Sequence, residues 1–154
     1  MKYMGNMLVV KDIEQSKKFY HDLLGQEVIA DFGANVTLTG GFALQTAESW
    51  QTFIHKQANE IGYGNNDAEL YFEIDDIDGF IEKLNAYGAE YVHPLQEHSW
   101  GQRGIRFYDL DKHIIEVGEN MAIVVKRFID SGLTIQQTAA RMGVPIEYVE
   151  SYLN

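Results

Sequence analysis

The chain has 154 residues, of which 45% are hydrophobic and 12% aromatic, so it is long and apolar enough for one domain with a real core or a domain with a short appendage. A formal net charge of −11 disfavours nucleic-acid phosphates and anionic membranes as partners. The chain has no cysteine, which excludes disulfides, thiolate metal sites and cysteine nucleophiles. The apolar run near the N-terminus is too short for a signal peptide, and no stretch approaches the roughly 18 consecutive apolar residues that a membrane-spanning helix needs. We therefore expect a cytoplasmic protein with no membrane partner.

The first half of the chain predicts the order β-α-β-β-β. A strand-like run ends at Asp12, which is suited to cap a helix that continues to Gly25. Three strand-like segments follow, EVIADF, NVTLT and FALQT, and Gly40-Gly41 forms the turn between the last two. Residues 49–66 are expected to form a linker, with Trp50 as a candidate stacking wall for a planar or apolar ligand.

The second half repeats this order. Ile77 stands 64 residues after Ile13, in a segment with the same pattern of apolar residues that ends at Gly88. The strand-like segments EYVHPL, GIRFYD and HIIEVG come next, with a turn at Asp111-Lys112. The fold class expected is therefore α+β, with a largely antiparallel, curved sheet in each half.

Three strings carry a resemblance to a known superfamily: LVVKDIEQSKKFYHDLLG, FEIDDIDGFIEKLNAYGA and SWGQRGIRFYDLDKHIIEV. They occur in the order typical of the vicinal-oxygen-chelate superfamily, which includes glyoxalases, extradiol dioxygenases and bleomycin-resistance proteins. The resemblance implies two modules, 1–48 and 67–120, whose sheets enclose a cavity. Residues 1–120 would form this domain and 121–154 a helical appendage.

Alternation along the predicted strands places one polar set on the face away from the helices. These residues are Glu69, Tyr71, Glu73, Arg106, Tyr108 and Glu116. The resemblance favours a cavity lined by them over a face open to bulk solvent. Glu69, Glu116 and Arg106 are the candidate catalytic residues, and His98, Trp100 and Trp50 join the tyrosines and Glu73 as candidate ligand-binding residues. His113, in the turn region, is expected to be exposed.

Metal-dependent members of the superfamily take four ligands from the first and last strands of each module. The internal repeat puts these slots at Gly5, Gln45, Glu69 and Glu116. Glycine supplies no ligand and an amide coordinates weakly, so His98 would have to complete a site for Zn²⁺, Ni²⁺, Mn²⁺ or Fe²⁺. If Arg106 instead pairs with these carboxylates, a metal-free binding pocket is expected.

Residues 121–154 predict a helix followed by a second helix, a turn at Gly143 and a final helix after Pro145. This resembles a helix-turn-helix, but the last helix carries two glutamates and no basic residue, which disfavours DNA. We expect the helices to pack on the domain or to build a homodimer contact.

Three functions follow as hypotheses. The first is a glyoxalase-like lyase or isomerase that acts on a small oxygenated substrate, with or without a metal. The second is a metal-free protein that sequesters a small molecule, as bleomycin-resistance proteins do, with an acidic pocket suited to a cation. The third is a regulatory module in which a small-molecule domain signals to the helical tail.

Overall fold

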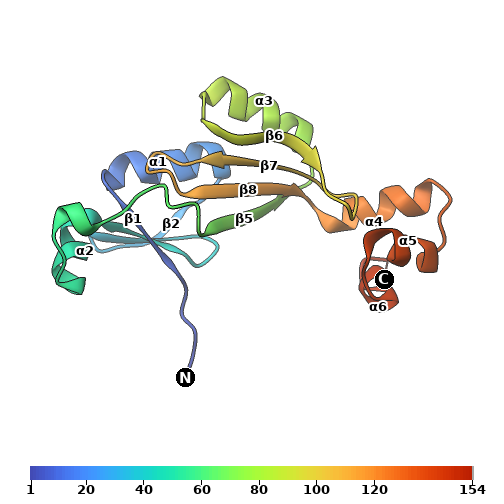
Figure 1. The fold of residues 1–154 in the computed structure, drawn as a ribbon, viewed down its shortest axis with the longest axis horizontal. Coiled ribbons are helices and arrows are strands. Elements are labelled where there is room, and N and C mark those ends of the chain that lie inside the picture. The colour runs from blue at the N-terminus through green and yellow to red at the C-terminus, as the bar shows by residue number, and fades with distance from the viewer. Residues whose placement is uncertain (154) are drawn as a thin grey trace. The chain divides into compact units, whose positions relative to one another are not determined.

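The computed structural model describes residues 1–153 and has a mixed α+β fold (Figure 1). Its strands are β1 Met7–Val10, β2 Val28–Asp31, β3 Asn35–Leu38, β4 Ala43–Thr46, β5 Glu69–Ile74, β6 Tyr91–Glu97, β7 Arg103–Tyr108 and β8 Ile114–Glu119. Its helices are α1 Ile13–Leu24, α2 Ala47–Ile54, the short 3-10 helix Ala58–Glu60, α3 Ile77–Tyr87, α4 Met121–Asp130, α5 Ile135–Met142 and α6 Ile146–Glu150. None of the helices within residues 1–153 is long and apolar enough to span a membrane.

The chain forms two compact units. The first comprises Met1–Ala68 together with Tyr108–Ile114, and the second comprises Glu69–Phe107 together with the chain from Ile115 onward. The turn between β7 and β8 therefore belongs to the first unit, whereas most of both strands belongs to the second.

The first unit contains a four-stranded mixed sheet in the order β1-β4-β3-β2. Strand β1 pairs in parallel with β4, and β3 pairs antiparallel with both β4 and β2. Helix α1 begins where the Asp12 carboxylate accepts from the Glu14 and Gln15 N–H groups, as predicted, and ends at Gly25 with a left-handed φ of 66°. Its buried aromatic residues, Phe19 and Tyr20, contribute to the core of this unit.

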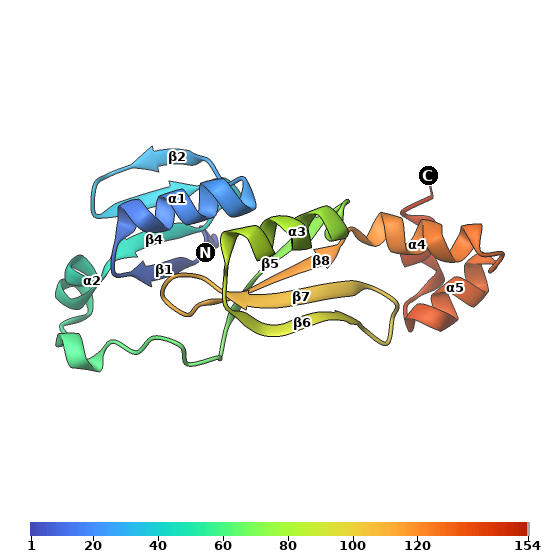
Figure 2. The same ribbon diagram turned by 90° about the horizontal axis from the view of Figure 1, so that it is seen from above.

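The second unit repeats this arrangement with the strand order β5-β8-β7-β6. Helix α3 covers one face of the sheet (Figure 2), and its Phe80 ring lies 5.9 Å from the ring of Phe107 on β7. The helix is capped by Asp76 and ends at Gly88, the positions that correspond to Asp12 and Gly25. The predicted β-α-β-β-β repeat is confirmed, and the opposite face of this sheet is left to polar side chains.

The segment after β4 begins with a helix. Helix α2 starts directly after the strand and extends into residues 49–66, the stretch that the sequence predicts to be a linker between the modules. The sequence AESWQTFI contains no glycine or proline, and its apolar residues lie mainly on one side of the helix. Helix formation satisfies backbone groups that an irregular linker would leave to water.

The three C-terminal helices belong to the second unit and have a small core of their own. The turn between α5 and α6 is made by Gly143, with a φ of 70°, as predicted. Helix α5 begins with a reciprocal capping box between Thr134 and Gln137. The buried residues of this core are Met121, Val124, Val125, Ala139, Met142 and Val149.

Candidate functional site

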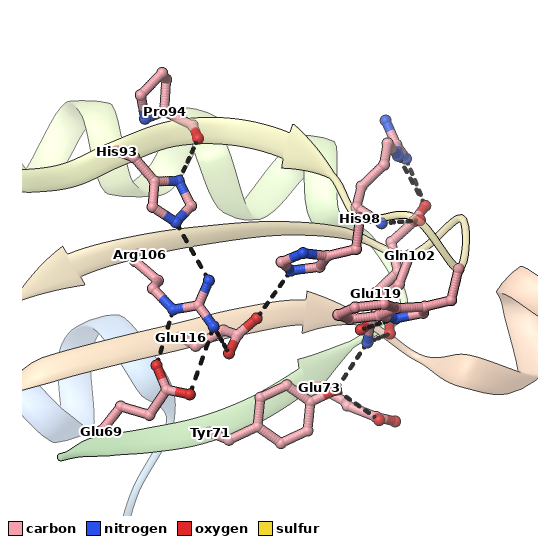
Figure 3. A network of polar contacts seen from close by, with 12 residues as sticks. Glu69, Tyr71, Glu73, His93, Pro94, His98, Gln102, Arg106, Glu116 and Glu119 are labelled. Atoms are coloured by element: carbon pink, nitrogen blue, oxygen red, sulfur yellow. Dashed lines mark hydrogen bonds and ion pairs between the residues drawn. The ribbon is translucent and has the colours of Figure 1, made fainter. Parts of the chain in front are cut away.

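Arg106 lies between two carboxylates on the open face of the second sheet (Figure 3). Its Nε donates to Glu69 Oε2 at 2.8 Å, and its Nη2 donates to Glu116 Oε2 at 2.5 Å. Glu69 stands on β5, Arg106 on β7 and Glu116 on β8, so neighbouring strands bring the three side chains together. The ion pairing of Arg106 with these carboxylates, one of the two alternatives expected from the sequence, is therefore present. It reduces the repulsion between the two carboxylates.

The third nitrogen of the guanidinium is also engaged. Arg106 Nη1 lies 3.3 Å from His93 Nε2, and His93 Nδ1 lies 2.8 Å from the carbonyl oxygen of Pro94. Because arginine only donates, these contacts fit an imidazole protonated on Nδ1 that accepts at Nε2. Every nitrogen of Arg106 thus has a protein partner, and an anionic ligand would have to compete with two carboxylates.

The two carboxyl groups around Arg106 have different acidities. The hydrogen bond from Arg106 lowers the pKa of Glu69, despite some opposing burial. Burial raises the pKa of Glu116, and the neighbouring Glu69 carboxylate adds to that rise while Arg106 opposes it. Glu116 is therefore the group of the pair that more readily holds a proton.

His98 reaches the same cluster from the loop before β7. Its Nε2 lies 3.3 Å from Glu116 Oε1, and its ring stacks on Trp100 at 4.3 Å between centroids with an interplanar angle of 9°. Gly104 on β7 leaves room for this contact, because a Cβ there would lie 3.3 Å from both His98 Nε2 and Glu116 Oε1. His98 thus adds a polar group next to Glu116 and supports the indole of Trp100.

A chain of hydrogen bonds runs across the face toward Glu73. Trp100 Nε1 donates to Gln102 Oε1 at 3.0 Å, and Gln102 Nε2 donates to the Tyr71 hydroxyl at 2.7 Å. Tyr71 in turn donates to Glu73 Oε1 at 2.9 Å. Burial raises the pKa of Tyr71 to about 12, so the phenol remains a neutral donor. The three hydrogen bonds run in one direction, from Trp100 to Glu73, so the series ends on a carboxylate.

These side chains form one wall of a cavity of about 550 Å³ within the second unit. The sheet side is lined by Tyr71, Glu73, Trp100, Gln102, Arg106 and Glu116. The other side comes from the C-terminal helices and is lined by Met121, Met142, Gly143, Val144 and Tyr148. A cavity of this size, with a mostly apolar lining and a few convergent polar groups, is suited to a small organic molecule.

A cluster of two arginines around Glu119 holds helix α4 at the end of the sheet. The buried carboxylate of Glu119 accepts from Arg103 Nε at 2.9 Å and from Arg127 Nη1 at 2.8 Å. Burial of Glu119 opposes its ionisation, but Arg127 and Arg103 outweigh that effect and lower its pKa to about 2. Gly101 adds to the fit, because a Cβ there would lie 2.3 Å from the Phe128 ring. Helix α4 is therefore held closely against the end of the sheet.

The residues in the expected metal slots do not fit a metal ion. Gly5 has a φ of 134°, and a Cβ on it would lie 2.4 Å from the carbonyl oxygen of Gly41, so the backbone excludes a ligand side chain there. Gln45 is 2% exposed, accepts from Asn35 Nδ2 at 2.7 Å and donates to Ser49 Oγ. Glu69 and Glu116 share Arg106, which a cation would have to displace. Within residues 1–153 no three His, Asp or Glu side chains are grouped to hold a metal.

Three other residues singled out in the sequence belong to the first unit. Tyr108, expected on the cavity face, belongs to the first unit and donates to Asn66 Oδ1 at 2.7 Å. Trp50, expected to be a stacking wall, lines a separate hollow of the first unit. His113, expected to be exposed, is instead partly buried: its Nδ1 lies 2.8 Å from Asp109 Oδ2, in a turn that Asp109 organises through two backbone N–H groups.

Several residues of the cavity lining were not predicted from the sequence. Gln102, on the sheet side, stands two residues after the predicted Trp100, and its place in the series of hydrogen bonds depends on cross-strand contacts. Met121, Met142 and Tyr148 belong to helices that were expected to pack on the domain or to build a homodimer contact. The available signal was a methionine and a tyrosine on either side of the Gly143 turn.

Paired β-α-β-β-β modules with polar side chains on the open sheet face define a protein of the vicinal-oxygen-chelate class. The family model of a glyoxalase-like domain matches residues 3–122, and the chain belongs to this family. Helices α5 and α6 lie beyond the matched residues.

Solved structures and a sequence relative resemble this chain over more than three quarters of its length. A protein of unknown function from Agrobacterium tumefaciens str. C58 is 40% identical, with a TM-score of 0.71, over 78% of this chain and 94% of that one. A lactoylglutathione lyase from Agrobacterium tumefaciens has the same fold, at 22% identity and a TM-score of 0.59, over 78% of this chain and 94% of its own. An uncharacterized protein, YetH, of Bacillus subtilis (strain 168) is 24% identical over 77% of this chain and 99% of its own length.

Proposed function

We propose that this chain is a metal-free small-molecule binding protein whose ligand occupies the cavity of the second unit. The observation that carries the proposal is the placement of Arg106 between Glu69 and Glu116. Metal-dependent members of the superfamily would need the side chains at these two glutamate positions to be available as metal ligands. The cavity beside this cluster is large enough for a small organic molecule and has aromatic as well as polar walls.

The donor chemistry favours this function over a metal-dependent one. A divalent cation prefers three or four good nitrogen or oxygen ligands. The second unit supplies two carboxylates that already hold a guanidinium, with His98 beside one of them. An arginine in that position provides the positive charge that a metal would otherwise bring.

Two measurements test this function together. Elemental analysis of the purified chain, after incubation with Mn²⁺, Ni²⁺, Zn²⁺ and Fe²⁺ and desalting, is expected to show much less than one metal per chain. NMR screening with a library of aromatic fragments is expected to shift the Trp100 indole N–H signal, and Tyr148→Ala is expected to reduce those shifts. One tightly held metal per chain that is lost in a Glu69→Gln, Glu116→Gln double variant would overturn the proposal.

A second candidate, a lyase or isomerase of the glyoxalase type, is favoured by one specific observation. Glu116 lines the cavity, and burial raises its pKa, which is a property of a general base. In an isomerisation, the Glu116 carboxylate would take a proton from the carbon next to a carbonyl group, and the electron pair of the C–H bond would form an enolate. In a substrate with a hydroxyl group on the first carbon, that hydroxyl proton would move to the enolate oxygen, and return of the abstracted proton to the former carbonyl carbon would complete the reaction, with Arg106 offsetting the negative charge of the enolate.

Deuterium exchange tests this second function. The α-protons of hydroxyacetone in D₂O would be lost faster with the wild-type chain than with Glu116→Gln, as followed by ¹H NMR. A control variant, Glu82→Gln, changes a carboxylate on the exposed surface of α3. Equal exchange rates for all three proteins would exclude Glu116 as the base for this class of substrate.

We also expect a cytoplasmic homodimer. Support for self-association comes from apolar side chains on and beside β2: Ile29 is 62% exposed and Phe32 is 75% exposed. Sedimentation analysis of the wild-type chain and of an Ile29→Ser, Phe32→Ser variant tests this expectation. A monomer at tens of micromolar wild-type protein would contradict it.

A further inference from the structure

The cavity of the second unit has an uneven distribution of charge. Among the described residues that line it, Arg106 is the one cation, and its guanidinium is already engaged by Glu69 and Glu116. Glu73 is the second carboxylate in the lining. The donors to Glu73 are the Tyr71 hydroxyl and, at 3.4 Å, the backbone N–H of Met121, and both donors are uncharged. The Glu73 carboxylate therefore lies at the cavity wall with no cationic partner among the described residues.

The surroundings of Glu73 are aromatic and rich in sulfur. Tyr71 and Trp100 come from the sheet side, and Tyr148 comes from α6 on the helical side. Burial, the Tyr152 hydroxyl and the negative charge of Glu73 raise the pKa of Tyr148 to about 12, so its ring stays neutral. Met121 and Met142 complete the apolar surface. Electron-rich ring faces and thioether sulfur attract a positively charged organic group, and a nearby carboxylate adds to this attraction.

We infer that the cavity selects an organic cation with an aromatic or apolar body, and that Glu73 is the countercharge for that cation. The inference rests on the proposed binding function and specifies its ligand class. Arg106 does not compete with the cation, because Glu69 and Glu116 hold its charge on the other side of the face. Tyr148 and Met142 come from helices beyond residues 3–122, so the site depends on a part of the chain outside the family domain.

A matched pair of dyes provides the test. Thioflavin T is a planar aromatic cation, and 2-(4-dimethylaminophenyl)-6-methylbenzothiazole has nearly the same shape without the charge. Binding would be followed by the anisotropy of each dye and by quenching of Trp100 fluorescence in a Trp50→Phe background, since the chain has two tryptophans. We expect thioflavin T to bind about ten-fold more tightly than its neutral analogue, as a partly desolvated cation on aromatic rings would.

Three variants separate the ligand class from the binding function. Glu73→Gln keeps the size of the side chain and is expected to weaken thioflavin T about ten-fold while it leaves the neutral dye within about two-fold. Glu82→Gln removes an equal charge from α3 and is expected to change neither dye. Tyr148→Ala removes part of the helical wall and is expected to weaken both dyes. Circular dichroism and thermal unfolding would confirm that each variant is folded.

The outcomes are distinct. Suppose that Tyr148→Ala weakens binding of both dyes, so that the binding function holds. Equal affinities for the two dyes, or an unchanged thioflavin T affinity in Glu73→Gln, would then overturn the cation inference alone. If neither dye bound saturably, or if Tyr148→Ala had no effect on either dye, the proposed binding function would fail and the cation inference with it.

Discussion

Arg106 Nη2 lies 2.5 Å from Glu116 Oε2, and the side chain of this glutamate is 7% exposed. A charge pair with one partner so nearly buried is costly to break, because the remaining carboxylate loses its counter-charge. We expect Arg106→Leu to lower the free energy of unfolding by about 3 kcal/mol, measured by urea denaturation at pH 7. Arg141→Leu removes a more exposed pair with Glu97 and is expected to cost less than about 1 kcal/mol of ion-pair energy. Equal effects of the two substitutions would show that the Arg106 cluster has no special role in stability.

Removal of Arg106 also tests why the site does not fit a metal. In Arg106→Ser, the carboxylates of Glu69 and Glu116 would face each other without a guanidinium, and His98 would lie beside them. We expect this variant to bind Mn²⁺ or Zn²⁺ more tightly than the wild-type chain, as measured by isothermal titration calorimetry. The additional substitution Glu116→Gln should remove the gain. No gain in Arg106→Ser would mean that the guanidinium is not what keeps a cation away.

The backbone at Gly5 explains the missing ligand at the first metal slot. Gly5→Ala would combine a strained positive φ with a Cβ 2.4 Å from the Gly41 carbonyl oxygen. We expect a loss of about 3 kcal/mol in the free energy of unfolding. Gly132→Ala is the matched control, because Gly132 has a φ of 97° and no atom within 4 Å of a new Cβ. The control is expected to lose only about 1 kcal/mol, so similar losses would contradict the clash at Gly5.

The Glu119 ion cluster makes a defined contribution to the pH dependence of stability. The folded-state pKa of Glu119 is lowered to about 2 from an ordinary value of 4.5. A carboxyl with a lowered pKa stabilises the folded state above its unfolded-state pKa, and that contribution is lost as the pH falls from 4.5 through 2. We expect Glu119→Gln to cost about 2 kcal/mol at pH 7, somewhat less than full linkage predicts, because both arginines are partly exposed. Urea denaturation at pH 7 and pH 3 checks this. A difference between the wild type and the variant that did not shrink at pH 3 would contradict the assignment.

Ligand binding should be detectable in the helical tail. Met142, Gly143 and Val144 lie at the turn between α5 and α6 and line the cavity. Because a bound ligand stabilises the state that contacts it, thioflavin T is expected to slow amide hydrogen exchange in α5 and α6. Exchange in α1, which lies in the first unit, serves as the internal reference. Unchanged exchange in both helices at saturating dye would argue against a helical wall.

The internal repeat made most of the fold predictable. Asp12 and Asp76 each cap a helix, and Gly25 and Gly88 each end one, so local chemistry determined these boundaries. Strand alternation also placed Glu69, Arg106 and Glu116 on one face correctly, because the period of a strand is fixed by its geometry.

Other features depended on information that a local pattern does not contain. The place of Tyr108 depended on where the chain passes from one compact unit to the other. The partial burial of His113 follows from the Asp109 carboxylate, which binds its ring and its backbone N–H together. The position of Tyr148 in the cavity wall could not be predicted, because it depends on how α6 packs. This helix is short, and its sequence has no charge pattern that indicates a ligand.

The cavity has one wall inside the family domain, and most of its other wall, apart from Met121, lies beyond that domain. Under the proposed binding function, chemical selectivity would therefore be divided between the family domain and the segment that follows it. Exchange of the residues beyond α4 for a different helical hairpin would replace Met142 and Tyr148 while it kept the Arg106 cluster and the Glu73 carboxylate. A lineage of such proteins would be able to change its ligands by varying the C-terminal segment, without rebuilding the sheet on which the polar groups stand.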